Sequence, residues 1–114
     1  MASLSNYLRP NRKRLALSQE EVAFLLGANG MDKGIKVSRD ENSVRKTNLE
    51  TALAYEAIYG IPVRELFAGL YAKAEKEVAK RAKVLRHRKA GKSNLKREEV
   101  ITKLVSKSDI KSNP

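Results

Sequence analysis

Few side chains in this 114-residue chain could carry out covalent or acid–base catalysis. His87 is the single histidine and lies in a basic stretch, and the chain has no cysteine. The acidic pairs Glu20–Glu21 and Glu98–Glu99 are adjacent on expected helices, so the two members of each pair point to different sides. These patterns place no nucleophile beside a base, and they include no metal-ligand or cofactor motif. The sequence therefore favours a binding protein over an enzyme, and no cofactor is expected.

Basic side chains are the more prominent chemistry. The chain has 24 Lys and Arg against 13 Asp and Glu, which gives a formal net charge of +11. An excess of this size predicts a polyanionic partner, most often nucleic acid. The excess is uneven, because residues 1–70 hold 10 basic and 8 acidic side chains whereas residues 71–114 hold 14 and 5. The charge therefore separates an almost balanced first part from a strongly basic second part.

Three features bear on the location of the chain. The longest run without a charge covers residues 22–31, about half the length that a membrane span needs. Glu20 and Glu21 stand near the start, where a secretory signal has basic residues. The lack of cysteine is compatible with a reducing compartment. We therefore expect a cytoplasmic protein that does not enter a membrane.

Helix-start signals place the short elements of the first part. Ser18 and Glu21 form a capping box, which predicts a helix over residues 18–27. After a glycine-containing turn, a short helix is expected over residues 35–41, and Asn48 is a good N-cap for the next helix, which ends at a glycine. The expected apolar core consists of Val22, Leu26, Val37, Leu53, Ile58, Leu66 and Phe67.

The second part has the pattern of longer helices. Apolar residues that step by three or four predict one helix over residues 63–89, and a final helix is expected from Leu95. Near the N-terminus, Pro10 is expected to kink or split the first helix. The sequence thus predicts an all-α protein, with a compact domain of four to five helices over residues 1–70 and a long basic helical extension with a frayed tail over residues 71–114.

Four separated blocks of the domain carry a family resemblance. They are Leu17-Ser18-Gln19-Glu20-Glu21-Val22-Ala23 with Gly27, Val37-Ser38-Arg39 with Glu41, Asn48-Leu49-Glu50-Thr51-Ala52-Leu53, and Gly60-Ile61-Pro62 before Glu65-Leu66-Phe67. In this order they resemble the lambda-repressor/Cro-like (XRE) helix-turn-helix family of transcriptional regulators, over about residues 4–68. The resemblance implies a helix-turn-helix domain in which the helix around residues 33–41 reads the major groove.

The resemblance also implies a set of DNA contacts. Arg39 is expected to read a base, because a guanidinium can bind O6 and N7 of guanine together. Lys33 and Lys36 are expected to bind bases or phosphates, and Gln19 and the segment after the recognition helix are expected to face phosphates. The expected DNA-binding residues are Gln19, Lys33, Gly34, Ile35, Lys36, Ser38, Arg39, Arg45, Lys46, Thr47 and Asn48.

The chain departs from the family pattern at four places. Residues 28–32 make the turn before the recognition helix about four residues longer than is usual in the family. Asp40 stands where the family usually has an aliphatic or aromatic residue, and it is expected to place an anion beside the DNA face. Ser43 replaces a common glycine, and Pro10 and Asn11 interrupt the usual first helix. A different entry angle of the recognition helix is expected from the longer turn.

These observations predict a sequence-specific double-stranded DNA-binding transcriptional regulator. An apolar stripe from Phe67 to Leu85 extends beyond what the domain can bury, which favours a homodimer through the 63–89 helix or the C-terminal helix. Alternatively, the C-terminal helix folds back and covers the stripe. Two other functions stay open: an antitoxin-like or regulatory protein-interaction module whose basic tail recruits an acidic partner, and a nonspecific basic nucleic-acid binder. No small-molecule ligand is indicated.

Overall fold

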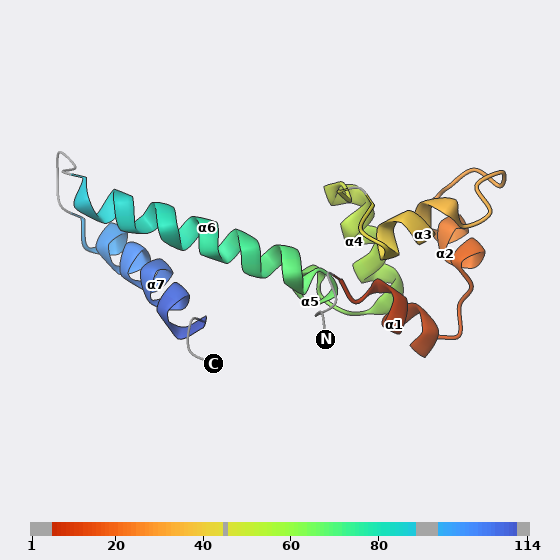
Figure 1. Ribbon diagram of the computed structural model, residues 1–114, viewed down its shortest axis with the longest axis horizontal. Coiled ribbons are helices and arrows are strands. Elements are labelled where there is room, and N and C mark those ends of the chain that lie inside the picture. The colour runs from red at the N-terminus through yellow and green to blue at the C-terminus, as the bar shows by residue number, and fades with distance from the viewer. Residues whose placement is uncertain (1–5, 45, 89–93, 112–114) are drawn as a thin grey trace. The chain divides into compact units, whose positions relative to one another are not determined.

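The computed structural model describes residues 6–44, 46–88 and 94–111, with side chains as far as Ser106, and these residues form helices and no strands (Figure 1). The expected all-α class is therefore confirmed for the part of the chain that is described. The helices are α1 (Leu8–Arg14), α2 (Gln19–Leu25), α3 (Ile35–Glu41), α4 (Leu49–Tyr59), α5 (Val63–Leu66), α6 (Ala68–His87) and α7 (Leu95–Lys111).

The chain divides into two compact units, Met1–Tyr71 and Ala72–Pro114. The division falls one residue after the boundary that the change in charge places at residue 70. The first unit contains α1 to α5, and the second contains most of α6 and all of α7. Helix α6 begins in the first unit and continues into the second.

The caps expected for α2 and α4 are present. The hydroxyl of Ser18 accepts from the backbone N–H of Glu21 at 3.0 Å, and the Glu21 carboxylate accepts from the N–H of Ser18 at 2.8 Å. The Asn48 side chain accepts from the N–H of Thr51 at 2.8 Å. Each cap satisfies a backbone donor that the first turn of a helix leaves without a partner, so these two helix starts could be read from sequence.

Two expectations about helix breaks are wrong. Pro10 neither kinks nor splits a helix, because α1 begins at Leu8 and Pro10 stands in its first turn, where a missing N–H costs little. The single helix expected over residues 63–89 is instead two helices. The backbone leaves the helical conformation at Phe67, with φ −115° and ψ 46°, and α6 begins at the next residue. Phe67 is buried, and its ring meets the edge of Tyr55 at a centroid distance of 6.3 Å.

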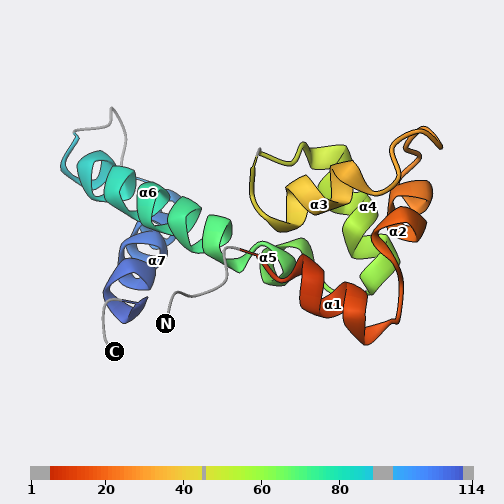
Figure 2. The same cartoon turned by 45° about the vertical axis from the view of Figure 1, so that its right-hand side comes forward.

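The core of the first unit differs in part from the expected set. Leu53 is 53% exposed, whereas Tyr55 and Tyr59 of the same helix are buried and stack with ring centroids 5.8 Å apart. Figure 2 shows α4 passing behind α3 in this unit. The core cluster consists of Leu8, Val22, Ala23, Val37, Ala52, Tyr55, Tyr59, Leu66 and Phe67.

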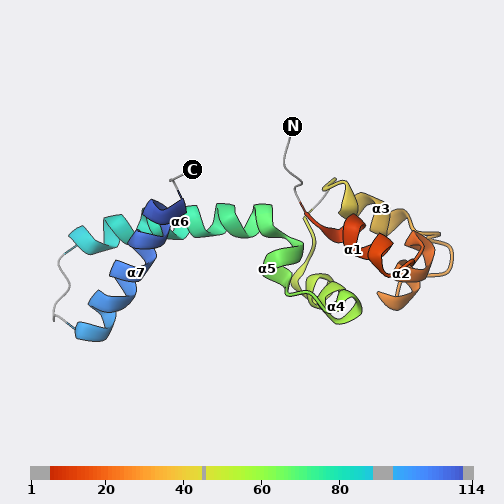
Figure 3. The same ribbon diagram turned by 90° about the horizontal axis from the view of Figure 1, so that it is seen from below.

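The second unit is held by a small apolar cluster. Helix α7 turns back along α6 (Figures 1 and 3), and Ala82 of α6 packs with Ile101 and Val105 of α7. The expected stripe is therefore divided: Ala82 is covered, whereas Val78 and Leu85 are 44% and 40% exposed. Within the described ranges, no helix combines the length and the apolar character needed to cross a membrane.

Candidate nucleic-acid interface

Gly34 sets the contact between the starts of α2 and α3. It is the N-cap of α3 and has a φ of +89°. A Cβ at this position would lie 2.9 Å from Cβ of Gln19 and 3.0 Å from the backbone C of Gln19 and N of Glu20. Only a residue without a side chain allows this approach, so glycine is required here both by its backbone conformation and by the space available.

Asp32 caps the first turn of α3. Its Oδ1 accepts from the N–H of Gly34 at 3.0 Å and from the N–H of Lys36 at 3.2 Å. The carboxylate also interacts favourably with the positive end of the helix dipole. The long turn between α2 and α3 therefore ends in a segment that fixes the start of α3.

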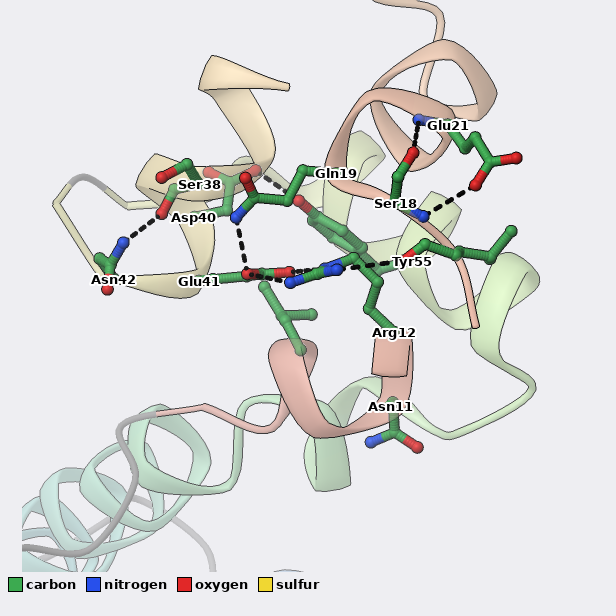
Figure 4. A network of polar contacts seen from close by, with 12 residues as sticks. Asn11, Arg12, Ser18, Gln19, Glu21, Ser38, Asp40, Glu41, Asn42 and Tyr55 are labelled. Atoms are coloured by element: carbon green, nitrogen blue, oxygen red, sulfur yellow. Dashed lines mark hydrogen bonds and ion pairs between the residues drawn. The ribbon is translucent and has the colours of Figure 1, made fainter. Parts of the chain in front are cut away.

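Both carboxylates of α3 are turned into the protein (Figure 4). Asp40 is 2% exposed, and its Oδ2 accepts from the hydroxyl of Tyr55 at 2.8 Å. The side chain of Glu41 is also 2% exposed, and it accepts from Nε of Arg12 at 2.6 Å and from Nη2 at 3.2 Å. Asp40 is thus bound by a tyrosine fifteen residues later and is withdrawn from the exposed face of α3, although it also lines the polar hollow described below.

Arg12, Gln19 and Glu41 join α1, α2 and α3. The side-chain amide of Gln19 donates to Oε1 of Glu41 at 3.1 Å, and Nη1 of Arg12 donates to the carbonyl of Leu17 at 3.0 Å (Figure 4). The hydrogen bond to Glu41 raises the pKa of Arg12, so this guanidinium stays charged. Gln19, expected as a phosphate contact, thus uses its amide N–H inside the protein. Arg12 is a positioning residue for α3 that the sequence did not reveal.

The outer face of α3 is basic. Ile35, Arg39 and Asn42 are exposed and lie on one face, because residues three and four apart share a side of a helix. Lys36 and Ser38 are half-buried at the two borders of this face, and Lys33 is exposed just before the helix. Among the expected contacts, Lys33, Ile35, Lys36, Ser38 and Arg39 are therefore gathered around one surface. Asn42 was not expected there, although its spacing of seven from Ile35 could have revealed it.

A polar hollow lies next to this face. It has a volume of about 110 Å³ and is lined by residues of α3, of the following segment and of the start of α4. Lys46 is exposed and Thr47 half-buried, whereas the Asn48 side chain is used as the helix cap. Arg45 lies outside the described residues. The lining residues are Lys36, Asp40, Lys46, Thr47, Asn48 and Thr51.

Two buried tyrosines lie behind the interface. Burial raises the pKa of both Tyr55 and Tyr59 well above the ordinary value, and for Tyr55 the hydrogen bond to Asp40 raises it further. The hydroxyl of Tyr59 has no hydrogen-bond partner among the described residues. Both groups are therefore neutral in the folded protein at pH values where an exposed tyrosine ionises.

We expect the free energy of unfolding to fall as the pH rises above about 10. Below that value both tyrosines are neutral in the folded and the unfolded chain, and above it only the unfolded chain releases their protons. Each tyrosine then contributes a slope of up to about 1.4 kcal/mol per pH unit. Urea denaturation at a series of pH values measures the slope, and Tyr59→Phe should remove about half of it. An unchanged slope in Tyr59→Phe would show that Tyr59 ionises normally in the folded protein.

The described residues contain no group of three or more potential metal ligands. The chain matches no known family model, no curated protein and no solved structure. The site offers an exposed helix with Arg39 on its outer face and Lys36 at the border, and a neighbouring polar hollow that is lined by lysines, by Asp40 and by the start of α4.

Proposed function

We propose that the protein is a sequence-specific double-stranded DNA-binding transcriptional regulator, in which α2, the following turn and α3 act as a helix-turn-helix. The observation that supports this most is the distribution of charge on α3. Its cations lie outside or at the border, whereas Asp40 and Glu41 are buried and bound by Tyr55 and Arg12. A helix with this distribution presents its cations, and not its carboxylates, on the face that would approach phosphates and base edges.

Base reading is assigned to the exposed face of α3. The major groove, about 12 Å wide, accepts one α-helix. Arg39 is exposed and can donate to both O6 and N7 of a guanine, and Ile35, which is 53% exposed, can contact the methyl group of a thymine. Lys33 and Asn42 flank these two residues. The role of α2 is to hold α3 through the Gly34 contact.

Backbone contacts are assigned to the polar hollow beside α3. Lys36 and Lys46 line it from two segments, together with Asn48 and Thr51 at the start of α4. Asp40 lines it too, with its carboxylate accepting from the hydroxyl of Tyr55. A phosphate there would meet two cations near a helix N-terminus, which favour an anion despite the nearby carboxylate. Such contacts fix the position of the helix on the duplex but do not distinguish sequences.

The experiment begins with selection of a preferred site from randomised duplexes by the full-length chain. If the protein binds as a homodimer, the selected site should contain two inverted half-sites about one helical turn, ~10 base pairs, apart. Selection of no preferred sequence, combined with tight binding of random duplex, would indicate a nonspecific binder. Failure to bind any duplex, combined with tight binding of an acidic protein, would indicate the protein-interaction function.

Arg39→Ala should then reduce discrimination between the selected and a random duplex. Loss of one bidentate contact with guanine corresponds to about 1–3 kcal/mol, or about a 5- to 150-fold change in the ratio of the two affinities. Arg9→Ala, which removes an exposed arginine from α1, is the matched control and should leave this ratio unchanged. Equal weakening of both duplexes by Arg39→Ala would show that Arg39 binds a phosphate and does not read a base.

A further inference from the structure

A row of lysines follows one side of α6. Lys73, Lys76, Lys80 and Lys83 are separated by three or four residues, so they share a face of the helix, and all four are exposed. We refer to these four residues as the lysine ridge. At 1.5 Å per residue the ridge is about 15 Å long, with a cation about every 5 Å.

One acidic residue of α6, Glu77, borders the ridge, because it lies four residues after Lys73 and three before Lys80. Its carboxylate pairs with Arg81 at 3.7 Å, and Glu75 is half-buried on the side of the helix that also carries the buried Ala79. Within the described part of the chain, no ion pair joins Lys73, Lys76 or Lys80 to a carboxylate. Like charges three and four residues apart destabilise a helix, and Glu77 offsets this repulsion only in part. An anionic partner would stabilise the remaining positive charge.

Helix α7 provides a contrast within the same unit. Its described side chains include Lys96, Arg97 and Lys103 together with Glu98 and Glu99, and Arg97 donates to Glu98 at 3.3 Å. The charges of α7 are therefore mixed and partly paired, whereas those of the ridge have one sign. The ridge is thus a face of single sign that holds four of the fourteen basic residues of the second unit.

The composition of the ridge favours a phosphate backbone over a protein partner. The cores of protein–protein interfaces are depleted in lysine and enriched in aromatic residues and arginine. Lysine binds phosphate as a point charge, without the directional requirement of arginine. Several regularly spaced lysines therefore suit a repeating row of phosphates whose exact geometry varies along the duplex.

We propose that the lysine ridge of α6 is a second nucleic-acid contact, which binds the phosphate backbone of duplex DNA without sequence preference. This inference rests on the proposed function in its choice of duplex DNA as the partner, but it does not require that α3 reads bases. The two surfaces have different roles: α3 provides discrimination, and the ridge provides affinity that decreases with salt.

The test is the salt dependence of binding by the full-length chain, measured with the selected duplex and with a random-sequence duplex. The ridge variant carries Lys73→Gln, Lys76→Gln and Lys80→Gln, and the control variant carries Lys13→Gln, Lys96→Gln and Lys103→Gln. Both lose three positive charges and keep residues that favour helix. Circular dichroism of both variants checks that helix content is preserved.

The ridge variant should lower the slope of log affinity against log salt by about 2.7, because each phosphate contact contributes about 0.9. Between about 50 and 200 mM salt, wild-type binding should then weaken about 40-fold more than binding of the ridge variant. The control variant should change this slope by less than about 0.9, which is the contribution of one phosphate contact. The ratio of affinities for selected and random duplex should be unchanged in the ridge variant.

The outcomes separate this inference from the proposed function. A lowered slope without any sequence preference in the wild type supports the ridge and overturns reading by α3. A preserved sequence preference with equal slopes in the ridge variant and the wild type overturns the ridge alone. Loss of binding to anionic lipid vesicles in the ridge variant, with an unchanged slope on DNA, would assign the ridge to a membrane surface and also overturn the inference.

Discussion

Gly34→Ala should destabilise the first unit by about 2–5 kcal/mol, the sum of backbone strain and of overpacking against α2. At φ +89° an L-residue is strained, and the added Cβ would stand 2.9 Å from Cβ of Gln19 and 3.0 Å from two backbone atoms. Backbone atoms cannot rotate away as a side chain can, so α3 must move. Chemical denaturation measures the loss of stability, and affinity for the selected duplex reports the movement of α3.

Gly27→Ala is the matched control for this prediction. Gly27 has almost the same φ, +85°, but a Cβ there would meet nothing within 4 Å. Its replacement should therefore cost only the backbone strain, about 1–2 kcal/mol. Equal losses in the two variants would mean that α2 and α3 are not in close contact at Gly34.

Removal of Arg12 is the other change with a large expected effect. Arg12→Leu leaves the Glu41 carboxylate buried, with only the amide of Gln19 as a described partner, and should cost about 3–5 kcal/mol. Replacement of both Arg12 and Glu41 by leucine should recover most of this loss of stability, because a buried ion pair can be exchanged for apolar side chains at little cost. Chemical denaturation of wild type, single and double variants gives the comparison.

Arg81 provides a control for charge removal. It pairs with Glu77 on α6, where the two side chains are 76% and 48% exposed. Arg81→Leu should change stability by less than about 1 kcal/mol, because water screens an exposed pair. If Arg12→Leu were as mild as Arg81→Leu, the Arg12–Glu41 pair would have to be open to water and could not hold α3 in place.

The parts of the fold that the sequence predicts correctly depend on neighbours in the chain. The capping box of Ser18 and Glu21 and the cap of Asn48 are complete within four residues, so residue types at fixed spacing are sufficient. The exposed cations of α3 are a similar case. Once Val37 is taken as buried, the helical period places Arg39 on the outer side.

The failures have two physical causes. Helix α4 has apolar residues on all sides, so periodicity could not show that Tyr55 is inside and Leu53 outside. The other failures depend on partners far apart in sequence. Asp40 is buried because Tyr55 reaches it, and Glu41 is buried because Arg12 does. From local composition both carboxylates would be expected on the surface. They are buried because residues of α1 and α4 contact α3.

The break at Phe67 belongs to the second group. The spacing of apolar residues continues through it without interruption, so the pattern predicts one helix. The backbone nevertheless leaves the helical conformation at Phe67, where the ring is buried against Tyr55. The apolar pattern contains no sign of this contact with α4.

The tyrosines of the chain all fall within one of its two units, so their fluorescence can be used to follow that unit. All four tyrosines, Tyr7, Tyr55, Tyr59 and Tyr71, fall within Met1–Tyr71, and the chain has no tryptophan. Fluorescence of Tyr7, Tyr55 and Tyr59 reports the first unit and that of Tyr71 the first turn of α6, whereas far-ultraviolet circular dichroism sums the helices of both units. The described core cluster of the second unit is small and consists of Ala82, Ile101 and Val105. We therefore expect this unit to unfold in a separate transition from the first. The two signals, recorded on one sample, separate the unfolding of the two units without cutting the chain.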